Sequence, residues 1–138
     1  EAARCTPQLM LRIEDRRLPD DELDSLVRAC DVVLAPYQRF VGSSGVLIWA
    51  AAHRKPVLTQ DYGLLGHLVR SYRLGHTLDT CDPARLAHAL SVIAAKPEIA
   101  RSEPSGTAAF LSGKSPKDFV ETLVRGAIES PASIGAYA

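Results

Sequence analysis

Two short and almost wholly apolar runs constrain the fold of this chain more than any other feature. Asp31 to Ala35 has the sequence DVVLA and stops at Pro36, and Lys55 to Thr59 has the sequence KPVLT. Continuous apolar runs of this length predict strands buried on both faces, as in a parallel sheet. Between them lies VLIWAAA, Val46 to Ala52, which is too apolar for a surface helix and suits a helix packed on that sheet.

Further strands and helices are expected at short intervals around these runs. Leu9 to Ile13 and Gly75 to Leu78 are candidate strands, and apolar residues at helical spacing follow Pro19 and Gly63. The C-terminal third is expected to be helical, with one loop. The expected features there are a helix from the N-cap Asp82 and Pro83 to Pro97, a polar loop from Ser102 to Gly106, and a last helix from Ser115 with Phe119, Leu123 and Val124 facing inward.

Strands that alternate with helices predict an α/β fold: a Rossmann-like, three-layer αβα arrangement around a short parallel sheet. We expect residues 1–129 to form this domain and residues 130–138 to be a flexible tail. Three or four strands are fewer than the five or six of most doubly wound sheets. The chain also begins at Glu1 and has its only methionine at Met10. Both observations suggest a piece of a longer polypeptide, with N-terminal processing as the alternative.

Composition excludes several classes of function. The 138 residues include sixteen basic and sixteen acidic side chains, so no charge excess draws the chain to nucleic acid or an anionic membrane. No apolar run reaches the roughly 20 residues that span a bilayer. Cys5, Cys30 and Cys81 are odd in number and widely spaced, which disfavours a disulfide framework or a zinc site. With no secretory signal visible, a cytoplasmic location is expected, with Cys30 as a buried thiol and no metal site.

In an open parallel sheet, ligands bind at the carboxyl ends of the strands. Three segments of this chain are expected there: Pro36 to Phe40, Gly42 to Val46, and Gln60 to Gly63. The second segment has the clearest chemistry, because small residues before a helix let an anion approach free backbone amides. Its candidate phosphate-binding residues are Ser43, Ser44, Gly45 and Val46. The alternative is that Ser44 only caps the helix and the glycines only shape the turn.

The order of these motifs resembles a known family. ACDVVLAPY (residues 29–37), SGVLIWAAAHRKPVL (residues 44–58) and Asp61-Tyr62-Gly63 are similar to the C-terminal half of a GT-B glycosyltransferase. The similarity is greatest to the large retaining group called group 1 or family 4. It extends over roughly residues 9 to 125.

The resemblance implies a nucleotide-diphosphate sugar as substrate, bound here, with an acceptor bound by a separate N-terminal domain of the same parent chain. It implies no cofactor and no metal, because basic side chains and the helix end stabilise the leaving phosphate. Alone, this segment is expected to be inactive, and its catalytic residues are unknown. The expected cleft residues are Tyr37, Gln38, Arg39, Trp49, Asp61, Tyr62 and Gly63.

The chain departs from the family at two key positions. The family commonly carries two glutamates around this turn, and the matching positions here are Val41 and Trp49. Trp49 cannot accept hydrogen bonds from a ribose. A non-catalytic GT-B-like module with an assembly or regulatory role is therefore the alternative function. A related GT-B sugar epimerase is a weaker one, because the segment displays no acid/base residues for it.

Single residues of the expected cleft also have two interpretations. Arg39 would replace a lost phosphate-binding cation or be a solvated loop residue. Asp61 would accept a hydrogen bond from a sugar hydroxyl or cap the following helix. Tyr37 would stack on a base or pack beside Phe40.

Overall fold

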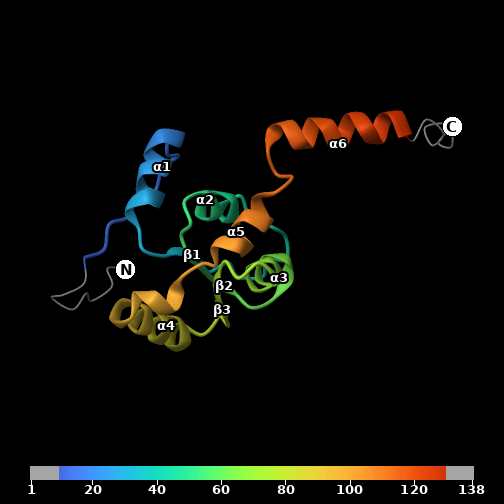
Figure 1. The fold of residues 1–138 in the computed structure, drawn as a ribbon. Helices are drawn as coiled ribbons and strands as arrows, with labels where there is room; N and C mark the ends of the chain where they lie inside the picture. The colour runs from blue at the N-terminus through green and yellow to red at the C-terminus, as the bar shows by residue number, and fades with distance from the viewer. Residues whose placement is uncertain (1–9, 130–138) are drawn as a thin grey trace.

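The computed structural model describes residues 10–129, which form a mixed α/β fold around one small parallel sheet (Figure 1). The strands are β1 (Val33–Ala35), β2 (Val57–Gln60) and β3 (Gly75–Leu78), hydrogen-bonded in that order. All pairs are parallel, so that Leu34 lies beside Leu58 and Leu58 beside His76. The connections are α2 (Val46–Ala52) between β1 and β2, and α3 (Gly63–Ser71) between β2 and β3. The expected strand from Gly75 to Leu78 is confirmed, and β2 begins two residues later and ends one residue later than the run from Lys55 to Thr59.

One face of the sheet carries the hydrophobic core. Ala35 and Val57 pack there with buried residues of α2, α3 and α5 (Pro104–Leu111). The helical residues of this core include Leu47, Leu65 and Phe110. Both crossover helices therefore lie on the same face, as right-handed crossovers between strands in sequence order require.

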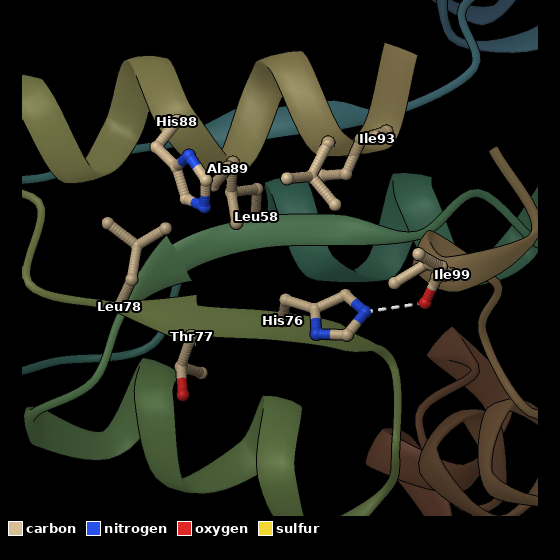
Figure 2. Close-up of a pocket in the computed structure, with 9 residues that line it drawn as sticks. Leu58, His76, Thr77, Leu78, His88, Ala89, Ile93 and Ile99 are labelled. Carbon is tan, nitrogen blue, oxygen red and sulfur yellow. Dashed lines mark hydrogen bonds between the residues drawn. The ribbon is translucent and has the colours of Figure 1, made fainter. Parts of the chain in front are cut away.

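The opposite face is covered by α4 (Pro83–Ala95), followed by the 3₁₀ helix η1 (Pro97–Ala100). Leu58 and His76 of the sheet and Ile93 of α4 line a cavity of about 280 Å³ there (Figure 2). The His76 Nε2 atom lies 2.6 Å from the backbone oxygen of Ile99, which ties η1 to β3. Helices on both faces of a parallel sheet make the layering compatible with a Rossmann-like fold.

Local signals explain where several elements begin. The carboxylate of Asp82 accepts from the amides of Ala84 and Arg85, at 2.9 and 3.3 Å, and Pro83 is the first helical residue, as predicted for α4. Before β1, α1 (Asp20–Ala29) begins with three acidic side chains that complement the helix dipole. The thiol of Cys30, after α1, is only partly buried and lies 3.2 Å from the oxygen of Val27.

The polar segment from Ser102 to Gly106 is not the predicted loop, because α5 begins within it at Pro104. Gly106 lets this helix pack closely on the C-terminal end of α3, because a methyl group at this position would lie 1.9 Å from the backbone oxygen of Tyr72. The close approach of the two backbones lets Phe110 of the same helix reach the core. Tertiary packing therefore decides the structure of a segment whose composition favours a loop.

Three other predictions are wrong. Leu123 and Val124 of α6 (Pro116–Glu129) are exposed, because α6 extends away from the sheet (Figure 1). Residues 10–13 form no regular secondary structure, while Leu9 lies outside the described residues. Burial on both faces holds for every residue of β2 but not for β1, where Leu34 is 46% exposed. The expected tail, residues 130–138, also lies outside the described residues.

Candidate functional site

The loops that follow the three strands meet at the carboxyl edge of the sheet. The backbone oxygen of Tyr37, just after β1, accepts a hydrogen bond from the hydroxyl of Tyr62, after β2, at 3.2 Å. The same oxygen accepts from the hydroxyl of Thr80, after β3, also at 3.2 Å. One carbonyl group thus connects all three loops.

The side chain of Tyr37 continues this network toward α2. Its hydroxyl lies 3.1 Å from the Ser44 hydroxyl, and its ring centroid is 5.0 Å from that of Phe40. In the structure Tyr37 therefore packs beside Phe40, which is one of its two predicted roles. Its hydroxyl links the start of the loop to the turn before α2.

Tyr62 also fixes the middle of the loop after β1. Its hydroxyl oxygen accepts from the backbone N–H of Arg39 at 2.6 Å. Arg39 has a φ of +56°, which is unusual for a residue with a side chain. The side chains of Gln38 and Arg39 are exposed at this edge, where they are accessible to a ligand.

The turn before α2 is only partly free to bind an anion. The Ser44 hydroxyl accepts from the amide of Val46 at 3.3 Å, and the Ser44 carbonyl accepts from that of Leu47 at 3.1 Å. Ser44 thus serves the start of the helix, and one amide expected to hold a phosphate is already bonded. Ser43 and Gly45 are exposed, and a methyl group on Gly45 would meet nothing within 4 Å. Space for a ligand therefore remains beside Gly45.

Two buried polar side chains of β2, Thr59 and Gln60, hydrogen-bond to the end of β1 and to the loop that follows it. The Nε2 of Gln60 donates to the backbone oxygen of Phe40 at 3.1 Å, and its Oε1 lies 2.7 Å from the Thr59 hydroxyl. That hydroxyl is also 2.8 Å from the oxygen of Ala35. Thr59 and Thr80 were not predicted as site residues. The available signal was a polar side chain in or just after an apolar strand, where burial requires a partner.

The turn after β2 contacts the loop after β1 through its backbone. Gly63 has a φ of +68°, and a methyl group there would lie 2.9 Å from the Cα of Val41. The amide of Leu64 donates to the oxygen of Val41 at 2.9 Å. The side chain of Asp61 is exposed and caps no amide of α3, so the predicted capping role is not observed.

Trp49 lies apart from this network, on the side of α2 toward α1. Its ring stacks with that of His53 at 6.4 Å, and the Nε2 of His53 lies 2.7 Å from a carboxylate oxygen of Asp24. The hydrogen bond from the Arg28 guanidinium, more than the nearby His53, lowers the pKa of Asp24 below its ordinary value. Of the two positions at which the resemblance implies glutamate, Trp49 thus lies on the side of α2 that carries His53, and Val41 is exposed.

An apolar cavity of about 290 Å³ adjoins the turn before α2. Ser43, Ser44 and Gly45 form one wall, and Ile48, Leu64 and Phe110 form much of the rest. Lys114 also lines it, with its ammonium 4.4 Å from the centroid of the Phe110 ring and bonded to the oxygen of that residue. The site thus offers hydroxyl groups at one wall and apolar contact at the other.

Residues 10–129 contain no group of three histidine, cysteine or acidic side chains that could hold a metal ion. None of the helices described in that range is long and apolar enough to span a membrane. Comparison of the chain with protein-family models, with curated proteins and with solved structures found no match.

Proposed function

We propose that this chain is the donor-binding part of a GT-B glycosyltransferase, which binds a nucleotide-diphosphate sugar and acts with a separate acceptor-binding domain. The observation that carries the proposal is the convergence of three loops on the Tyr37 carbonyl at the carboxyl edge of the sheet. Open α/β sheets bind their ligands at this edge. The ordered resemblance from Asp31 to Gly63 adds the identity of the ligand.

Each group of residues has a role in this proposal. The diphosphate binds at Ser43, Ser44 and Gly45, beside the open space at Gly45, while the Val46 amide, already bonded to the Ser44 hydroxyl, shapes the turn. Tyr37, Gln38 and Arg39 contact the nucleotide, with the Arg39 guanidinium supplying positive charge to the phosphates. Asp61, Tyr62 and Gly63 face the sugar, where the exposed Asp61 carboxylate accepts from hydroxyl groups.

Titration of the full chain with UDP- and GDP-sugars, followed by calorimetry, tests donor binding. We expect at least one sugar nucleotide to bind, and Ser44→Arg to weaken it at least tenfold by filling the phosphate position. Ser91→Arg is the matched control, because Ser91 is exposed on α4 and bonds only to its own helix. If none of the sugar nucleotides binds at millimolar concentration, the donor-binding proposal is wrong.

A non-catalytic GT-B-like module is the second candidate, and the position of Trp49 favours it. A glutamate there would serve a donor, whereas Trp49 stacks on His53 beside α1. Ser44→Arg in the complete protein separates the two candidates. If the unaltered complete protein transfers a sugar and Ser44→Arg abolishes the transfer, the enzyme is supported. If the unaltered complete protein transfers no sugar and Ser44→Arg leaves its assembly function intact, the module is supported.

A further inference from the structure

β1 has a free edge. The amide of Val33 donates to the oxygen of Pro56 at 2.9 Å, and neighbouring residues of a parallel strand bond to opposite sides. The amide and carbonyl of Leu34 therefore point away from β2, toward a side where no strand pairs within residues 10–129. The Leu34 side chain is half exposed as well. An unpaired edge with an exposed apolar side chain is a template for another strand.

An apolar segment of the same chain is available for this edge. Residues 10–13 have no regular structure, and Met10, Leu11 and Ile13 are 93%, 59% and 76% exposed. In an extended conformation Leu11 and Ile13 lie on one side, with Arg12 on the other. Leaving three large apolar side chains in water forgoes roughly 1.5–3 kcal/mol for each one that could be fully buried.

The helix that joins this segment to β1 already lies in the position of a crossover. α1 contacts α2 through the pair Asp24–His53, whose atoms are 2.7 Å apart, and Val27 is its buried residue. α2 makes the crossover from β1 to β2. Right-handed crossovers between strands added in order place successive helices side by side on one face. A strand beyond β1 therefore has its crossover helix in α1.

The turn between the segment and α1 is also formed. Arg16 bonds the Glu22 carboxylate of α1 at 2.9 Å through Nη1 and the Glu14 carboxylate at 3.1 Å through Nε. These contacts hold residues 14–16 against the start of the helix, at the end where a parallel strand before α1 would finish. The connection from residue 14 to residue 32 is longer than the dozen residues that a crossover needs.

Residues 10–13 pair with no strand that the structure describes, and they are exposed. We propose that the free edge of β1 is a docking site for them, where they leave this conformation and join the sheet as a fourth parallel strand. Leu11 pairs with Val33, Arg12 with Leu34 and Ile13 with Ala35. Leu11 and Ile13 then enter the layer beneath α1 and α2, and the aliphatic stem of Arg12 covers Leu34. This strand brings Glu14 to the edge of the sheet that carries Tyr37.

Amide hydrogen exchange of the full chain, measured by NMR, tests the proposal independently of any ligand. We expect the amides of Leu34, Leu11 and Ile13 to exchange at least tenfold more slowly than in an unfolded chain, whereas the Arg12 amide points away from β1 and stays unprotected. Ile13→Asp returns the Leu34 amide to rapid exchange, while the amide of Leu58 in β2 stays protected. Met10→Asp is the matched control, because its side chain lies on the opposite side of the strand, and it leaves Leu34 protected.

Rapid exchange of the Leu11 and Ile13 amides in the unaltered chain overturns the proposal, as does protection of Leu34 that survives Ile13→Asp. Protection that disappears on dilution assigns the edge to a second copy and also overturns it. If Ile13→Asp exposes Leu58, the variant has unfolded, and cross-linking decides instead. Arg12→Cys with Leu34→Cys, in a chain whose native cysteines are serine, must then form an intramolecular link with a short bifunctional reagent. Absence of that link contradicts the proposal.

Discussion

The hydroxyl of Tyr62 donates to the backbone oxygen of Tyr37, 3.2 Å away, and so connects the loop after β2 to the loop after β1. The same hydroxyl accepts from the amide of Arg39 at 2.6 Å. A single side chain thus satisfies one donor and one acceptor of a loop that makes no regular secondary structure. The shape of the candidate site therefore depends on this side chain as well as on Thr59 and Gln60 of β2.

Tyr62→Phe therefore destabilises the chain by about 1–2 kcal/mol, because two hydrogen bonds worth about 1 kcal/mol each are lost. Urea denaturation followed by circular dichroism measures the change. Tyr72→Phe is the control, since the Tyr72 hydroxyl makes no hydrogen bond with any residue described in the structure, and it costs less than about 0.5 kcal/mol. Equal effects of the two substitutions would show that the Tyr62 hydroxyl does not support the loop.

Gly63→Ala is expected to cost more than an ordinary glycine substitution in a turn. The residue has a φ of +68°, and the new methyl group would lie 2.9 Å from the Cα of Val41. Gly113 has a similar φ of +71° but nothing within 4 Å, so Gly113→Ala carries the dihedral strain alone. We expect about 1 kcal/mol for Gly113→Ala and about 2–4 kcal/mol for Gly63→Ala, measured by urea denaturation. Similar costs would contradict close packing at Val41.

The parts of the fold that sequence patterns predict are those with local causes. Asp82 followed by Pro83 supplies the cap and the first φ angle of α4 within neighbouring residues. The apolar run from Val46 to Ala52 has the bounds of α2, because its composition suits burial against a sheet. In contrast, the packing of α5 depends on the close approach of Gly106 to Tyr72, which is distant in the chain. The polar composition of residues 102–106, taken alone, predicts a loop.

The candidate site also has features that the sequence predicts and features that it does not. Topology places the three loops at the carboxyl edge, and this much follows from the order of strands and helices. The hydrogen bonds to the Tyr37 carbonyl come from residues 25 and 43 positions away, and no local pattern marks a backbone oxygen as their shared acceptor. The contact of His53 with Asp24 likewise depends on where α1 packs. The binding roles of these residues remain predictions.

Acid is expected to weaken the ion pairs that Asp24 makes in α1, of which the pair with Arg28 is the strongest. The Arg28 guanidinium, together with His53, holds the pKa of Asp24 below its ordinary value of 3.8. A lowered folded-state pKa gives stability that is present above the unfolded-state pKa and is lost as the pH falls through the folded-state pKa. Asp24→Asn should therefore flatten the dependence of the urea midpoint on pH between about pH 5 and pH 2.

Asp21→Asn is the control for this measurement, because Asp21 is an exposed carboxylate of the same helix whose side chain makes no ion pair among the residues described. It should keep the acid dependence of the unaltered chain. If Asp24→Asn also keeps that dependence, the ion pairs of Asp24 do not contribute to stability.

Substitutions at Phe110 and Leu123 compare a buried side chain of α5 with an exposed side chain of α6. Phe110 of α5 is 2% exposed, and its ring packs edge-on against that of Tyr72 with centroids 5.4 Å apart. Leu123 of α6 is 56% exposed. Phe110→Ala should cost about 3–5 kcal/mol in urea denaturation, because it removes a core side chain and leaves a cavity. Leu123→Ala should change stability by less than about 0.5 kcal/mol, since a half-exposed surface position has little packing to lose. A cost above 2 kcal/mol for Leu123→Ala would mean that α6 packs on a surface in solution, in place of extending from the sheet.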